Sequence, residues 1–88
     1  MMDTTTTARL TRLEAALLDS LRQNAGKCLS RQFLLRTIWG YADGVRSRTL
    51  DVHIRRLRTK LGPDGKDRIK TILGNGYYWE AEIDPANN

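Results

Sequence analysis

Leucines recur at intervals of three and four residues near the start of the chain, at Leu13, Leu17, Leu18 and Leu21. This spacing places side chains on one face of an α-helix and therefore predicts an amphipathic helix. Thr11 followed three residues later by Glu14 is typical of a capping box, which marks a helix start. Gly26 is the residue at which we expect this helix to stop.

A second apolar cluster follows Ser30, whose hydroxyl can cap a helix over residues 31–39. Gly40 is placed to end that helix. The candidates for burial on it are Phe33, Leu34, Leu35 and Ile38. Residues 41–46 are expected to form a loop.

The clearest helical pattern covers residues 48–61, where a narrow apolar stripe contains Leu50, Ile54, Leu57 and Leu61. At about 100° per residue these four side chains fall together, so this side of the helix is expected to face the core. Ser47 is a plausible cap for this helix. Gly62 and Pro63 are expected to close it and to begin a turn over residues 62–65.

The last third of the chain reads as a β-hairpin. Residues 68–73 form a strand-like run, and Gly74-Asn75-Gly76 is a strong turn pattern. The return strand, residues 77–83, alternates, with Tyr77, Trp79, Ala81 and Ile83 on one face and Tyr78, Glu80 and Glu82 on the other. The inward face of the outgoing strand stays open. Three helices followed by a hairpin predict an α+β fold of the winged helix-turn-helix type.

Length and composition fit a single small domain. The 88 residues, 40% hydrophobic and 28% charged, are typical of a globular domain with a thin core. We expect the domain to cover residues 10–83, after a disordered segment or short strand at 1–9 and before a polar tail at 84–88. The N-terminal residues do not have the pattern of a secretory signal, and we expect no membrane span because no apolar run approaches the ~18–20 residues that cross a bilayer. Cys28, the only cysteine, is expected to be a small buried side chain in a reducing cytoplasm.

The positive charge of the chain is concentrated in one segment. Residues 46–61 contain six basic side chains and one acidic one, so this segment carries +5, the same as the net charge of the whole chain. A basic patch on one element indicates a polyanionic partner, although a solvated helix face has the same composition.

The side of the third helix opposite its apolar stripe carries Asp51, Val52, Arg55, Arg56, Arg58 and Thr59. Val52 is an apolar residue in the middle of this basic face. Against DNA it could pack on a thymine methyl group while neighbouring arginines reach guanine edges or phosphates. Asp51 lies four residues before Arg55 and could hold its guanidinium group in a fixed orientation, or it could be an ordinary helix-pair carboxylate.

Catalytic and metal chemistry find no support in the sequence. His53 is the only histidine, and no cysteine lies near it, so we expect no metal site. It could contact a phosphate or serve in packing. No nucleophile–base set and no phosphate-cradling glycine loop occurs, so we expect neither an enzyme nor a cofactor.

The order and spacing of these motifs resemble the effector domain of OmpR/PhoB-type response regulators. The resemblance covers roughly residues 10–83. It rests on Leu10-Thr11-x-x-Glu14-x-x-Leu17-Leu18, Ser30-Arg31, Leu34 to Trp39-Gly40, the run from Arg48 to Leu61, Ile69-Lys70-Thr71 and Gly74-x-Gly76-Tyr77. It implies a bacterial two-component transcription regulator in which the third helix enters the major groove and the hairpin wing touches the minor groove.

The resemblance also implies individual roles. Base edges or the groove floor would be met by Val52, Arg56 and Arg58. The sugar–phosphate backbone would be held by Arg48, Thr49, His53, Arg55 and Thr71. The core would contain Leu34, Trp39, Ile54, Leu57 and Tyr77. The loop at residues 40–47 corresponds to the segment with which activators engage RNA polymerase, and family members usually bind as pairs on direct repeats.

The chain departs from the family pattern in three ways. Nine N-terminal residues cannot supply the four-stranded sheet with which the effector domain usually begins. No receiver domain is present, so control by aspartyl phosphorylation is not expected in this chain. In the wing, Leu73 and Tyr78 replace residues that are often basic, so we expect affinity to depend mainly on the third helix.

Three functions follow as hypotheses. The first is sequence-specific binding of double-stranded DNA by a transcriptional regulator. The second is a winged-helix interaction module that acts on RNA polymerase or another regulator. The third is a nucleoid-type protein that coats DNA without sequence preference. Comparing the affinity for selected and random duplexes distinguishes the first from the third.

Overall fold

The first helix, α2 (Arg12–Gln23), begins at the predicted capping box. Thr11 Oγ1 accepts a hydrogen bond from the backbone N–H of Glu14 at 3.1 Å, and the Glu14 carboxylate accepts one from the Thr11 N–H at 2.9 Å. The computed structural model describes residues 9–42, 44 and 47–81, so most of the predicted 1–9 segment and the 84–88 tail lie outside it. The helix ends with Asn24 as its C-cap, earlier than the predicted stop at Gly26.

The second predicted helix is present over its full length in two parts, α3 (Arg31–Leu34) and the π-helix η1 (Leu35–Trp39). The predicted Ser30 cap is confirmed, since its hydroxyl accepts a hydrogen bond from the Phe33 N–H at 3.0 Å. Gly40 ends the segment in the left-handed conformation, at φ 76°. This conformation costs little without a Cβ.

The third helix, α4 (Thr49–Lys66), is longer than predicted because a further helical turn follows Gly62. Gly62 breaks the helix with φ 77° and ψ −173°. Pro63 then starts the additional turn, where its fixed φ and missing N–H suit a first helical position. The predicted end of the main helix at Gly62 is confirmed, and the turn predicted at residues 62–65 takes the form of one further helical turn. The N-cap of α4 is Arg48, which makes no side-chain cap hydrogen bond, and not the predicted Ser47. Ser47 Oγ, one residue earlier, accepts a hydrogen bond from the Thr49 N–H at 3.1 Å.

The hairpin is confirmed and belongs to a three-stranded antiparallel sheet in the order β1-β3-β2. Its strands are β2 (Ile69–Ile72) and β3 (Gly76–Trp79), with Thr71 opposite Tyr77. The third strand, β1 (Leu29–Ser30), was not predicted. Gly76 lies so close to β1 that a Cβ there would be 2.0 Å from the Leu29 carbonyl oxygen. The return strand ends at Trp79, before the predicted end at residue 83, and residues 82–83 lie outside the described part.

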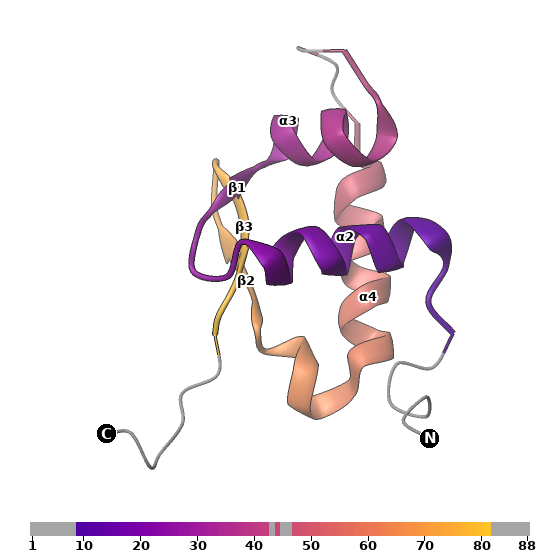
Figure 1. The fold of residues 1–88 in the computed structure, drawn as a ribbon, viewed down its shortest axis with the longest axis vertical. Helices are drawn as coiled ribbons and strands as arrows, with labels where there is room; N and C mark the ends of the chain where they lie inside the picture. Colours follow the sequence, from indigo (N-terminus) through magenta and orange to yellow (C-terminus); the bar gives the residue numbers. More distant parts are fainter. Residues whose placement is uncertain (1–8, 43, 45–46, 82–88) are drawn as a thin grey trace.

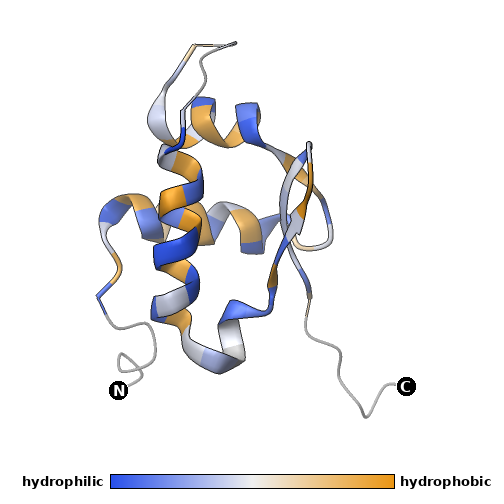
Figure 2. Ribbon diagram, turned by 180° about the vertical axis from the view of Figure 1, so that it is seen from behind, coloured by the Kyte–Doolittle hydropathy of each residue, from blue (hydrophilic) through white to orange (hydrophobic). Residues whose placement is uncertain are grey.

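The core lies where α2 crosses α4, with α3 and the sheet at its sides (Figure 1). Hydrophilic and apolar residues alternate in bands along α4 (Figure 2), as expected of a helix with one buried side. The buried apolar residues are Leu17, Leu18, Leu21, Leu29, Leu34, Leu35, Leu50, Ile54, Leu57, Ile69 and Tyr77. The core residues implied by the family resemblance are thus confirmed, with Trp39 partly buried at the edge.

The structure corrects the prediction for Cys28, which is exposed. In β1 the side chains alternate, and Leu29 takes the buried position next to it.

Ile69 and Tyr77 give the sheet its inward face, which settles the orientation of the outgoing strand. Of the helices in the described ranges, none combines the length and apolar character needed to cross a bilayer.

Candidate nucleic-acid interface

One side of α4 is anchored in the core, and the opposite side is exposed to solvent. Leu50, Ile54 and Leu57 are at most 1% exposed, whereas Val52 is 40% exposed. We call the exposed residues on this opposite side the outer face, which consists of Arg48, Val52, Arg55, Arg56 and Thr59. The anchoring of one side leaves the other available to a partner.

The guanidinium groups of Arg55 and Arg56 have no hydrogen bond or ion pair with any described residue. Nearby, the side chains of Arg48, Asp51, Val52, Arg55 and Arg56 line a shallow hollow of about 430 Å³. This hollow combines several donors with one apolar side chain, a combination suited to base edges and phosphate oxygens.

Asp51 belongs to a different set of contacts from the one predicted. Its carboxylate pairs with the guanidinium group of Arg31 on α3 and accepts a hydrogen bond from the Tyr77 hydroxyl at 2.5 Å. Arg31 also donates to the Ser47 carbonyl at 3.1 Å. The predicted pairing of Asp51 with Arg55 is therefore wrong, because Asp51 points toward α3 and the hairpin, to which it ties the start of α4.

These contacts shift the pKa values of Asp51, Arg31 and Tyr77. The hydrogen bond from Arg31 lowers the pKa of Asp51 despite its partial burial, with help from the Tyr77 hydroxyl. The hydrogen bond to Asp51 likewise raises the pKa of Arg31. Burial and the Asp51 carboxylate raise the pKa of Tyr77 to about 12. At neutral pH the carboxylate is thus ionised and balanced by the guanidinium group.

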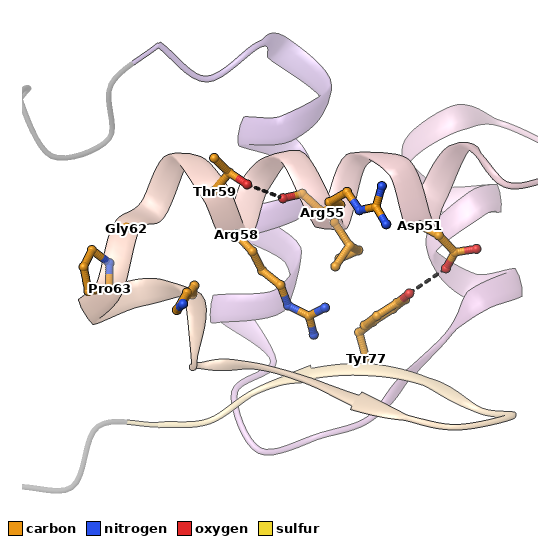
Figure 3. Close-up of a pocket in the computed structure, with 9 residues that line it drawn as sticks. Asp51, Arg55, Arg58, Thr59, Gly62, Pro63 and Tyr77 are labelled. Atoms are coloured by element: carbon orange, nitrogen blue, oxygen red, sulfur yellow. Dashed lines mark hydrogen bonds between the residues drawn. The ribbon is translucent and has the colours of Figure 1, made fainter.

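Arg58, which the family resemblance implies as a base contact, lies against the hairpin (Figure 3). Its Nη2 donates to the Ile69 carbonyl at 2.6 Å and to Thr71 Oγ1 at 2.8 Å. The guanidinium carbon lies 5.8 Å from the centroid of the Tyr77 ring. Arg58 therefore joins α4 to both strands of the wing and brings Thr71 into the same cluster.

His53 and Thr49 lie near the N-terminal end of α4 and contact each other. His53 Nδ1 is 2.8 Å from the Thr49 carbonyl oxygen, and its ring meets Trp39 edge-on at 5.0 Å between centroids. Because a carbonyl only accepts, this geometry assigns the proton to Nδ1. These contacts support a packing role for His53, and the predicted contact with the DNA backbone stays a prediction.

The other flank of α4 carries an ion pair between the half-buried Lys60 and the buried Glu14, which the sequence does not predict. Lys60 Nζ lies 2.7 Å from the Glu14 carboxylate and 3.0 Å from the Arg9 carbonyl oxygen. Burial disfavours the charged form of Glu14, but Lys60 and the Thr11 N–H outweigh it and lower the pKa of the carboxyl group. The two residues are 46 positions apart, so no local pattern in the sequence could have paired them.

Comparison with known proteins finds that the chain is similar to transcriptional regulators. The family described as "Transcriptional regulatory protein, C terminal" matches residues 5–79. The transcriptional regulatory protein CseB of Streptomyces coelicolor is 44% identical over 72 residues, which cover 82% of this chain and 30% of that protein. RpaA of Synechocystis, a DNA-binding dual master transcriptional regulator, is 45% identical over 82% of this chain and 31% of that protein. The chain thus spans about a third of the length of these relatives.

Solved structures share the fold. The RstA DNA-binding domain of Klebsiella pneumoniae, in complex with the RstA box, superposes with a TM-score of 0.73 at 32% identity, covering 82% of this chain and 73% of that one. The CpxR DNA-binding domain of E. coli gives a TM-score of 0.73 at 37% identity, covering 83% and 74%. The chain belongs to the family of transcriptional regulatory protein C-terminal domains, the winged-helix effector domains of OmpR/PhoB-type response regulators.

Proposed function

We propose that this chain binds double-stranded DNA in a sequence-specific manner as part of a transcriptional regulator, with α4 in the major groove. The observation that carries this proposal is the outer face, where Val52, Arg55 and Arg56 are exposed on a helix whose opposite side is buried. An α-helix fits the major groove, where arginine recognises guanine and an apolar side chain recognises the thymine methyl group. A homologous domain solved in complex with its DNA box supports the same use of the fold.

Within this proposal the residues divide into two groups. Val52 and Arg56 read bases, together with those donors of Arg58 that do not bond the hairpin. The sugar–phosphate backbone is contacted by Arg48, Thr49, His53, Arg55 and Thr71.

The proposal also includes the setting in which the regulator works. It acts in the cytoplasm without catalytic activity, pairs with a second copy on direct repeats and contacts RNA polymerase through residues 40–47. Of that loop, residues 43, 45 and 46 lie outside the described part.

A selection from random duplexes tests the proposal, and enrichment of a short motif is the expected result. With about five phosphate contacts, the logarithm of affinity for the enriched duplex should fall with the logarithm of salt concentration at a slope of about −4 to −5. A selection that enriches nothing while the protein still binds all duplexes alike would identify a non-specific DNA coater instead.

Two neighbouring arginines provide a matched pair of variants. Arg56→Ala should cost about 1–3 kcal/mol of binding free energy and relax the preference at one base pair. Arg55→Ala should weaken binding to all sequences equally. Unchanged binding of the enriched duplex by Arg56→Ala would show that Arg56 does not read a base.

The exposed hairpin turn supports a second function, a protein-interaction module. Leu73 is 89% exposed, and such an apolar side chain suits a contact with RNA polymerase or another regulator. Co-purification with polymerase that is lost in Leu73→Ser, together with no duplex binding at low salt, is the result expected for this function. Tight duplex binding at low salt would argue against it as the main role.

A further inference from the structure

Three hollows follow one another from the outer face of α4 to the side of α4 that faces the hairpin. The first is the hollow on the outer face described above, and it shares Asp51 and Arg55 with a cleft of about 530 Å³ between α4 and the hairpin. That cleft in turn shares Arg58 and Lys66 with a hollow of about 350 Å³ at the base of β2. We call these three hollows together the trough, which leads from the outer face to the foot of the wing.

The described walls of the trough are strongly basic. Its basic side chains are Arg48, Arg55, Arg56, Arg58, Lys66 and Lys70. Its acidic ones are Asp51 and Asp67. Asp51 is paired with Arg31, and Lys70 is paired with Glu80 at 3.2 Å. Figure 3 shows Arg58 reaching from α4 toward the strands in the middle of the cleft. A basic trough open along its length fits a linear polyanion better than a single small ligand.

Lys66 owes its place in the trough to the break in α4. Because Gly62 redirects the chain and Pro63 starts another helical turn, Lys66 returns to the cleft and does not continue along the helix axis. Arg58 is engaged with the Ile69 carbonyl and Thr71, whereas Lys66 is exposed and its ammonium group bonds to no described residue. Lys66 thus offers an unengaged cation where the cleft and the hollow at the base of β2 meet.

We propose that one strand of the bound duplex runs its sugar–phosphate backbone along the trough and that Lys66 binds a phosphate of this strand. This inference rests on the proposed function. A helix in the major groove is flanked by the two strands that border the groove. The strand on the hairpin side must pass between α4 and the wing, where the trough lies. Lys66 adds a phosphate contact to those implied by the family resemblance, and it carries no base specificity.

Lys66→Gln tests the inference, with Lys27→Gln as the matched control. Lys27 is also exposed but lies between α2 and β1 and lines none of the three hollows. Affinities are measured over a series of salt concentrations for an enriched and a random duplex. We expect Lys66→Gln to weaken binding to both duplexes by the same factor and to make the salt slope shallower by about one. Lys27→Gln should behave like wild type.

Ethylation of single phosphates locates the contact. On the wild-type complex, ethylation should interfere at a phosphate beside the major groove, and this one site should lose its effect in Lys66→Gln. If wild type binds but both lysine variants share its salt slope and its interference pattern, the inference about Lys66 is overturned while the proposed function stands. If wild type binds no duplex even at low salt, the proposed function itself fails. Thermal melting verifies that both variants are folded.

Discussion

The cations of α4 fall into two regions that differ in what they contact. The guanidinium groups of Arg55 and Arg56 on the outer face bond no other described residue, whereas Arg58 and Lys60 on its flanks hold the hairpin and α2. The net charge of this segment counts all four alike, but only the outer pair has unengaged guanidinium groups. In a basic helix, some of the cationic side chains can therefore stabilise the fold while the others stay available to bind a partner.

The largest loss of stability is expected from a substitution on the buried side of α4, which anchors the whole helix in the core. Leu57→Ala removes a fully buried side chain and should lower the free energy of unfolding by about 2–5 kcal/mol. Urea unfolding followed by circular dichroism measures this loss. A loss below about 1 kcal/mol would mean that the contacts of Arg58 and Lys60, and not the core, hold α4 in place.

Removal of the charge of Glu14 measures how much its ion pair with Lys60 contributes to stability. Glu14→Gln should cost about 1–3 kcal/mol at neutral pH, because the buried Glu14 carboxylate loses its charge-assisted hydrogen bond with the half-buried Lys60. The pKa of Glu14 in the folded protein lies below its ordinary value of 4.5, so the stabilisation is present above that pH and is lost as the pH falls through the folded value. The stabilities of wild type and variant, measured by urea unfolding across this range, should converge in acid. A constant difference would contradict this origin.

Arg58→Ala and Arg56→Ala compare the two regions directly. Loss of the hydrogen bonds to the hairpin should cost Arg58→Ala about 1–2 kcal/mol of stability, while Arg56→Ala should stay within about 0.5 kcal/mol of wild type. Thermal melting of both variants gives the answer. Equal melting temperatures would remove the distinction between flank and outer face.

The smallest expected effect concerns the hydroxyl group of Tyr77. Tyr77→Phe loses one hydrogen bond to Asp51, which still has Arg31, and should cost about 0.5–1 kcal/mol. Since the pKa of Tyr77 is raised from 10.0 to about 12 in the folded protein, this difference is present below pH 10 and disappears as the pH rises toward 12. Stability across this alkaline range is the test, and tyrosinate absorbance should reveal one late-titrating group in wild type alone.

Local patterns in the sequence predict the elements of this fold well and their long-range contacts poorly. The capping box at Thr11, the buried stripe of α4 and the hairpin turn all follow from residues close together in the chain. The two-residue strand β1 is too short to show a period, and the helical turn after Gly62 is hidden by two residues that usually end a helix.

In the candidate nucleic-acid interface, too, local patterns predict which residues are exposed but not their long-range contacts. The exposure of Val52, Arg55 and Arg56 follows from the helical period, because these residues lie opposite the buried leucines. Asp51 was expected to pair four residues along its own helix, and its actual partners, Arg31 and Tyr77, are 20 and 26 positions away. Such pairs depend on how elements pack, which no single-segment pattern contains.

The close approach of Gly76 to the Leu29 carbonyl leaves no room for even a methyl group where the hairpin meets the strand before α3. Movement of the hairpin relative to the helices is therefore restricted next to its turn, where Gly76 pairs with Ser30. We therefore expect the span between α4 and the wing to be fixed. Under the proposed function, a duplex that contacts both would have to bend or change its groove width, so we expect deformable sequences to be favoured even at base pairs that no side chain touches.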